Sequence, residues 1–125
     1  MKPDPKKVRL AALLGFLAVA LGAFGAHGLQ PLLNQHDTVE IWKTASHYHL
    51  VHAVVLLVIA LFHSDDSAAR WSWKCMTWGV LIFSGTLYAL AVSGTKWLGA
   101  ITPIGGRLLL IGWLLLPIRR WPRVE

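Results

Sequence analysis

The most regular feature of the sequence is a series of long apolar stretches separated by short polar ones. The first, Leu10–Ala26, contains no charged residue and follows Lys6, Lys7 and Arg9. About 20 apolar residues are needed to cross the hydrocarbon core of a bilayer, so we predict a membrane span over residues 8–27. This stretch is longer than the roughly 7–15 apolar residues of a signal peptide, which favours a retained helix.

The rest of the pattern predicts three further spans, at residues 42–62, 73–92 and 105–118. Asp37 with Glu40 three residues later resembles a capping box and predicts a helix start near Thr38. Residues 28–41 before it are expected to form a short polar connection. The chain is therefore predicted to be all-α, a single integral membrane four-helix bundle covering residues 1–125.

The fourth span differs from the others because it is short and carries Arg107 in its first turn. We expect this arginine to extend its charged end to the membrane interface. Part of 98–104 is expected to complete the crossing.

Composition and charge agree with a membrane protein and predict its orientation. Of the 125 residues, 55% are hydrophobic and only 14% are charged. The net charge of +6 does not indicate nucleic-acid binding, because the basic residues flank apolar stretches. Basic residues favour the cytoplasmic side, so both termini are predicted to be cytoplasmic. That side would hold nine (Lys2, Lys6, Lys7, Arg9, Arg70, Lys74, Arg119, Arg120, Arg123) and the other side three (Lys43, Lys96, Arg107).

Small residues predict where the helices approach one another. In a bilayer, helices associate where small side chains let their backbones come close. At ~100° per residue, six small residues of the first span fall on one face: Ala11, Gly15, Ala18, Gly22, Gly25 and Ala26. Gly105 and Gly112 form a smaller face on the fourth span. We interpret both as packing faces.

The candidate chemistry lies in the second span, where Tyr48, His49 and His52 share one helical face. At ~1.5 Å per residue, His52 lies about 16 Å into a core of about 30 Å. His49 lies one turn farther out. Neither histidine is explained as an interfacial residue, so both are expected to point into the bundle.

The third span supplies a matching polar face formed by Thr77, Ser84 and Tyr88. Ser84 is at roughly the depth of His52, and Tyr88 at that of His49, so we expect two hydroxyls to meet two imidazoles. His27, at the outer end of the first span, is a further candidate. The candidate ligand-binding residues are His27, Tyr48, His49, His52, Ser84 and Tyr88.

This polar cluster admits three interpretations. Its hydrogen bonds can simply hold the helices together, at ~0.6 kcal/mol each on average. It can bind a lipid headgroup, a quinone or a small solute from the outer side. Alternatively, His49 and His52 can ligate haem or a transition metal, because imidazole suits zinc, copper and iron.

Several classes of transporter and enzyme are excluded because the sequence lacks residues that they require. A proton-coupled exporter needs a carboxylate within the membrane, yet all six acids are predicted in loops or tails: Asp4, Asp37, Glu40, Asp65, Asp66 and Glu125. A thiol oxidoreductase needs two cysteines, and only Cys75 is present. A Ser–His hydrolase built on Ser84 lacks a residue to orient the base.

Three separated motifs resemble one known family: 22–29 (GAFGAHGL), 42–53 with Trp42-Lys43-Thr44-Ala45 and Tyr48-His49-Leu50-Val51-His52-Ala53, and 102–106 (TPIGG). The chain resembles the YgdD-like family of small bacterial inner-membrane proteins, which has animal relatives. The resemblance implies a four-helix membrane protein of unknown function. By the family pattern, the positions of interest are His27, Tyr48, His49, His52, Pro103, Gly105 and Gly106.

The sequence therefore predicts a non-enzymatic accessory or lipid- or small-molecule-binding membrane protein. The alternative is a haem-, metal- or quinone-binding redox protein that uses His49 and His52. Expected partners are membrane lipid, and possible ones are a quinone, another membrane protein or a second copy of the chain. No cofactor is required by the first interpretation.

Overall fold

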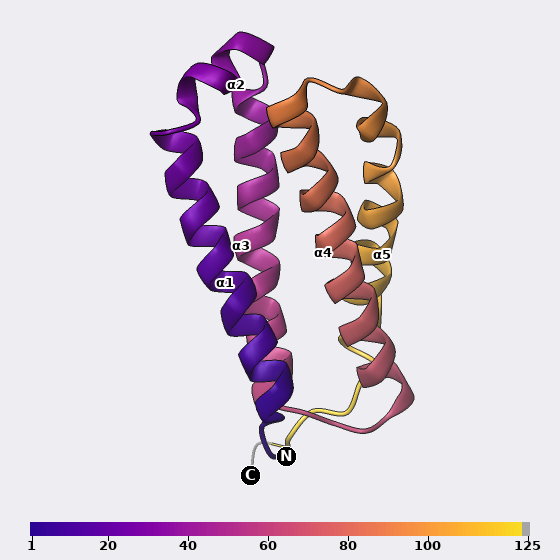
Figure 1. Cartoon of the computed structure of the whole chain (residues 1–125). Helices are drawn as coiled ribbons and strands as arrows, with labels where there is room; N and C mark the ends of the chain where they lie inside the picture. The colour runs from indigo at the N-terminus through magenta and orange to yellow at the C-terminus, as the bar shows by residue number, and fades with distance from the viewer. Residues whose placement is uncertain (124–125) are drawn as a thin grey trace.

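A computed structural model describes residues 1–123, and in this part of the chain every regular element is a helix (Figure 1). Four helices are long and apolar enough to cross a membrane, with mean hydropathies of 1.6 to 2.0. The all-α, four-span prediction is confirmed. Glu125, predicted to lie in the tail, is outside the described residues. In order, the elements are α1 (Pro5–Ala26), α2 (Gln30–His36), α3 (Val39–Leu61), α4 (Ser67–Ser93), the 3₁₀ helix η1 (Lys96–Ala100) and α5 (Thr102–Leu115).

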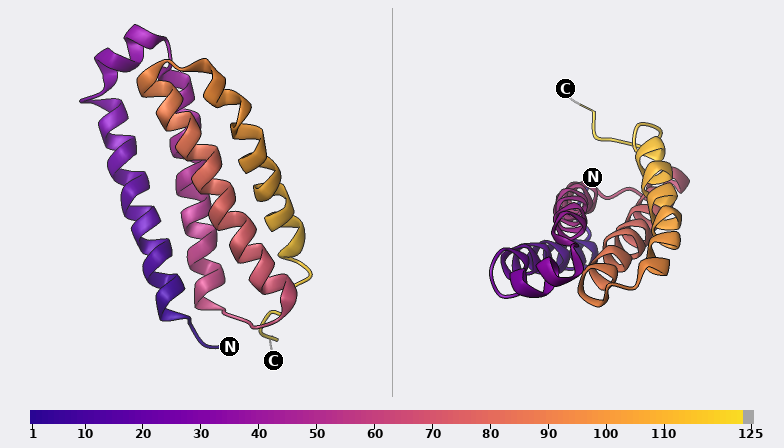
Figure 2. Two further views of the ribbon diagram at one scale, coloured as in Figure 1. Left: turned by 45° about the vertical axis from the view of Figure 1, so that its right-hand side comes forward. Right: turned by 90° about the horizontal axis from the view of Figure 1, so that it is seen from above.

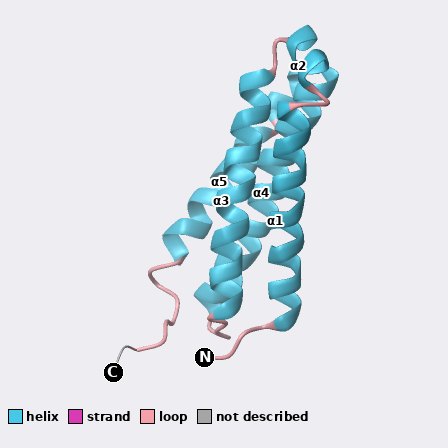
Figure 3. Ribbon diagram, turned by 90° about the vertical axis from the view of Figure 1, so that its left-hand side faces the viewer, coloured by secondary structure: helices cyan, strands magenta, loops and turns pink. Residues whose placement is uncertain are grey.

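The long helices pack in chain order: α1 against α3, α3 against α4, and α4 against α5 (Figure 2). By Cα positions, α1 stays more than 8 Å from α4 and α5, and α3 stays more than 8 Å from α5. Both described chain ends lie at one end of the molecule, hereafter the terminal end (Figure 3). The short helix α2 lies at the opposite end, hereafter the α2 end. This arrangement leaves a groove on each side of the α3–α4 pair.

The α2 helix was not predicted, because its polar residues resemble a simple connection. It forms with Pro31 in its first turn, and its Leu33 is fully buried in a cluster with Trp42 and Ala91. The burial of one leucine against two long helices stabilises seven residues that have little helical signal of their own.

The capping-box prediction is wrong, although α3 does begin next to Thr38. Asp37 has φ 55° and ends α2 in a left-handed conformation. Thr38 precedes α3, and its hydroxyl donates to the Ala91 carbonyl of α4 (2.7 Å) instead of capping its own helix. A contact between helices has replaced the local cap.

Each long helix starts before its predicted span, by three residues in α1, α3 and α5. The α4 helix starts at Ser67, six residues before the predicted 73, because Asp66 caps it by accepting from the Ala69 N–H (3.2 Å). The α5 helix ends at Leu115, before the predicted 118, since Pro117 has no N–H to continue the helical hydrogen bonds. Together, η1 and α5 form a 20-residue apolar span from 96 to 115, as expected.

Glycines determine how closely the helices approach. On α1, Ala11, Ala18 and Gly25 of the predicted small-residue face are buried, whereas Ala26 is exposed. The α4–α5 interface also depends on glycine. A Cβ on Gly112 would lie 2.5 Å from a side-chain carbon of Met76, and one on Gly105 would meet the backbone of Phe83. The predicted Gly105–Gly112 packing face is confirmed.

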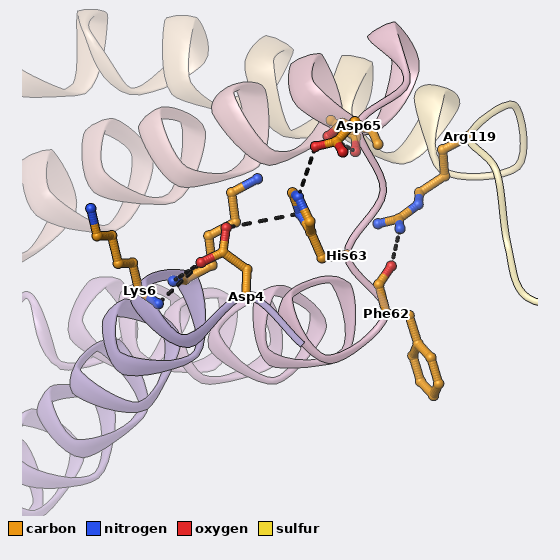
Figure 4. Close-up of polar contacts among 9 residues, drawn as sticks. Asp4, Lys6, Phe62, His63, Asp65 and Arg119 are labelled. Carbon is orange, nitrogen blue, oxygen red and sulfur yellow. Dashed lines mark hydrogen bonds and ion pairs between the residues drawn. The ribbon is translucent and has the colours of Figure 1, made fainter. Parts of the chain in front are cut away.

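Polar contacts hold the terminal end together (Figure 4). The Asp4 N–H donates to the Ala60 carbonyl (2.9 Å), which fixes α1 on α3. His63 lies between Asp4 (3.9 Å) and Asp65 (3.0 Å). Arg119, only 3% exposed, donates to the Phe62 carbonyl and so ties the chain after α5 to the end of α3.

A pH-dependent contribution to stability is expected from Asp66. Its carboxylate accepts from the Ser64 hydroxyl and from the N–H groups of Ala69 and Arg120, which lowers its pKa. A pKa lower in the folded state means that the stabilisation is present at neutral pH. It is lost as the pH falls through the acid range in which Asp66 becomes protonated.

Asp66→Ala is therefore expected to lower the free energy of unfolding at pH 7 by about 1 kcal/mol, typical of a lost N-cap. Asp66→Asn keeps a capping oxygen but does not titrate. At pH 7, Asp66→Asn should lower the free energy of unfolding less than Asp66→Ala does. On acidification, it should lose less stability than the wild type. Thermal unfolding in mild detergent at pH 7 and at about pH 2, below the ordinary aspartate pKa of 3.8, followed by circular dichroism, measures both effects. Equal losses for the two variants at pH 7 would contradict the capping role.

Candidate functional site

The polar residues predicted to form one cluster are divided between the two grooves. His49 and His52 are both buried, 6% and 4% exposed, as expected for residues that point into the protein. His49 faces the groove between α1 and α4, whereas His52 faces the groove between α3 and α5. The reason is angular, because residues three apart on a helix differ by ~60° in direction.

The predicted contact between His49 and Tyr88 is present. The His49 Nδ1 lies 2.9 Å from the Tyr88 hydroxyl, and this hydroxyl lies 3.4 Å from the Ser46 Oγ. The Tyr88 ring packs against that of Trp42, with ring centres 4.6 Å apart. The adjacent cavity, about 130 Å³, is otherwise lined mainly by leucine and valine from α1 and α4. This pair thus joins α3 to α4 inside an apolar environment.

The other predicted contacts are absent. The Ser84 hydroxyl donates to the Ala45 carbonyl (2.8 Å) and not to His52, so that pairing was wrong. Thr77 has a buried hydroxyl without a partner among the described residues. His27 ends α1 and is exposed beside a shallow cavity formed with Phe24 and Gly28. It does not join the cluster, because its exposed side chain lines this separate cavity at the end of α1.

His52 instead uses both ring nitrogens in a contact with α5. Its Nδ1 lies 2.7 Å from the Tyr48 carbonyl, which can only accept, so the Nδ1 carries the proton. The Nε2 lone pair then accepts from the indole N–H of Trp113 (3.0 Å). The Tyr48 ring is parallel to the imidazole, with centres 6.0 Å apart. A neutral histidine of fixed tautomer therefore links α3 to α5.

Trp113 was missed because tryptophans in a membrane protein are usually assigned to the interfaces. The sequence signal that could have identified Trp113 is its depth in the membrane span. Trp113 lies 11 residues into α5 and His52 lies 13 residues into α3, so the two are at a similar distance from the α2 end.

The histidines do not fit the predicted metal or haem site. Binding a metal through His52 would require displacing the Trp113 indole from Nε2, because Nδ1 is protonated. The two imidazoles also line different grooves. Within residues 1–123, no three His, Cys, Asp or Glu side chains are grouped closely enough to hold a metal ion.

The groove between α3 and α5, hereafter the α3–α5 groove, is the largest of the cavities described above at about 460 Å³. Phe83 is its one lining residue from α4, and the lining combines aromatic and leucine side chains with one charge, Arg107. It can hold an elongated apolar molecule with a polar end. Its lining residues are Tyr48, His52, Phe83, Pro103, Gly106, Arg107, Leu109, Leu110 and Trp113.

Comparison with known proteins supports a membrane protein and assigns no catalytic or binding activity. Residues 21–106 match a family described as a protein of unknown function, DUF423. The chain is 46% identical over 110 residues to a UPF0382 membrane protein of Staphylococcus epidermidis, covering 87% of this chain and 89% of the relative. It is 45% identical over 112 residues to one of Haemophilus influenzae, covering 89% and 90%.

A more distant relative is the UPF0382 membrane protein of the yeast Schizosaccharomyces pombe, 38% identical over 109 residues, with coverage of 83% and 92%. No solved structure matches the chain significantly. The matched segment contains the His49–Tyr88 pair and five of the nine residues that line the α3–α5 groove, whereas Arg107 and Trp113 lie beyond it. The chain belongs to the DUF423 family of membrane proteins, whose function is unknown.

Proposed function

We propose that this protein is a non-enzymatic membrane protein that binds a lipid in the α3–α5 groove. The observation that carries the proposal is the lining of this groove. Aromatic and leucine side chains form most of its surface, and Arg107 is its one charged residue. Ligand sites in proteins are mostly apolar with a few placed polar groups, and a groove between helices opens sideways to the bilayer.

The polar residues inside the groove support binding over catalysis. The His52 imidazole is hydrogen-bonded at both nitrogens, so it has neither a free lone pair nor a free proton for acid–base work. Ligation of haem or a metal by His52 would need the His52–Trp113 hydrogen bond to break. We therefore assign His52 the role of fixing α5 against α3 at the inner end of the groove, the end farther from α2.

The membrane location completes the proposal. The motifs shared with the YgdD-like proteins support a place in the bacterial inner membrane. The excess of basic residues at the terminal end supports an orientation with both termini in the cytoplasm. The α3–α5 groove would then open into the bilayer with Arg107 toward the outer leaflet.

The test fills each groove in turn. Gly106 lines the α3–α5 groove, with room for a Cβ at 3.7 Å from the Phe83 ring, and Gly85 lines the α1–α4 groove, with nothing within 4 Å of a Cβ. We expect native mass spectrometry in mild detergent to show a retained lipid on the wild type and on Gly85→Leu. Gly106→Leu is expected to lose most of it. Loss in Gly85→Leu alone, or no lipid on the wild type, would contradict the proposal.

A further inference from the structure

We propose that the lipid in the α3–α5 groove is anionic, with its phosphate bound by Arg107. This inference rests on the proposed lipid-binding function and adds the chemical class of the ligand. It predicts a preference for a lipid whose headgroup carries net negative charge, such as phosphatidylglycerol, over a zwitterionic lipid of the same chain length.

Arg107 is a cation without a protein partner in the described chain. It makes no hydrogen bond or ion pair with any residue of 1–123, whereas Lys43 at the same end pairs with Glu40 (3.4 Å). An arginine within a membrane span is costly unless it reaches water or an anion. Its planar guanidinium is well suited to a phosphate, which it can bind through two hydrogen bonds.

The polar groups of the groove are unevenly distributed along it. At the inner end, His52 and Trp113 bond to each other and offer nothing to a ligand. Toward the α2 end, the Arg107 guanidinium and the Tyr48 hydroxyl have no hydrogen-bond partner among the described residues, and Tyr48 is 40% exposed. The donors that remain available are thus at one end, where a headgroup would lie. The apolar remainder fits an acyl chain.

The distances along α5 agree with this placement. Arg107 and Trp113 are six residues apart, about 9 Å along a helix. Arg107 lies five residues from Thr102, the first residue of α5, and 11 residues from Lys96, the first residue of the span. Long basic side chains extend from such positions toward the interface. A headgroup bound by Arg107 would therefore lie on the α2 side of Trp113, with Leu109, Leu110 and Trp113 beside the acyl chain.

The experiment compares two lipids with identical acyl chains on delipidated protein in mild detergent. Phosphatidylglycerol and phosphatidylcholine are added in turn, and the lipid-bound fraction is measured by native mass spectrometry. The wild type is expected to bind phosphatidylglycerol about tenfold more tightly, a typical effect of a charge-assisted contact. Arg107→Gln should bind both lipids equally. Lys96→Gln removes an exposed cation at the same end, outside the groove, and should keep the preference.

The outcomes separate this inference from the proposed function. Equal binding of both lipids by the wild type, with binding still lost in Gly106→Leu, would overturn the anion preference and leave the lipid groove standing. A preference that Lys96→Gln loses as fully as Arg107→Gln would overturn a specific role for Arg107. Binding unaffected by Gly106→Leu would contradict the groove itself. Glycerol phosphate is expected not to compete at equal concentration, and competition by it would overturn a lipid ligand.

Discussion

Replacing Trp42 with alanine is expected to lower the free energy of unfolding by about 3 kcal/mol. This is the lower end of the range for Trp→Ala in protein cores. The lower end of the range applies because the surrounding lipid is itself apolar, unlike water. The substitution therefore removes mainly van der Waals packing energy. Trp42 is 5% exposed, lies over Gly25 of α1, and packs against Tyr88 of α4. Its indole N–H donates to the Leu21 carbonyl (2.9 Å).

The matched control is Trp78→Ala, because Trp78 is 61% exposed on α4. It is expected to change the free energy of unfolding by less than about 0.5 kcal/mol, as is usual for exposed positions. Unfolding by sodium dodecyl sulfate in mixed micelles, followed by circular dichroism, measures both variants. Similar losses for Trp42→Ala and Trp78→Ala would show that Trp42 does not join α1, α3 and α4 as described.

The second large effect is expected at Gly105, where α5 packs against α4. Gly105→Ala should lower the free energy of unfolding by about 1–3 kcal/mol, the usual cost of overpacking. A Cβ there would meet the backbone of Phe83 and would lie 2.8 Å from the Gly79 carbonyl oxygen. Backbone atoms cannot rotate away, so the helices would have to separate.

Gly106 is the control, because the same substitution one residue later has room. A Cβ on Gly106 would lie 3.7 Å from the nearest Phe83 ring carbon, an ordinary contact. Gly106→Ala should therefore be neutral or stabilising by up to about 1 kcal/mol, since alanine favours helix over glycine. The same mixed-micelle unfolding compares the two. Equal effects of Gly105→Ala and Gly106→Ala would contradict the close approach of α4 and α5.

The candidate site was predicted in part, and its errors have a common origin. Depth along the helices was predicted well enough to pair His49 with Tyr88. Depth alone also paired Ser84 with His52, but Ser84 bonds to the Ala45 carbonyl and His52 bonds to Trp113. The position of a residue in the sequence gives its depth along its own helix and the direction in which its side chain leaves that helix. It does not give the rotation of that helix relative to its neighbours.

The sequence by itself determined the four membrane-crossing helices, because their length and hydropathy must match the bilayer whatever the packing. It also determined that Gly105 and Gly112 form a packing face, since helices approach where side chains are small. Only the tertiary structure decided how α2 and α3 begin and end and which residues meet in the site. Thr38 bonds to Ala91 rather than to its own helix, and α2 forms because Leu33 is buried by two other helices. The two grooves arise because α1, α3, α4 and α5 pack in chain order, so the polar face of α3 is shared between neighbours that only the folded chain brings together.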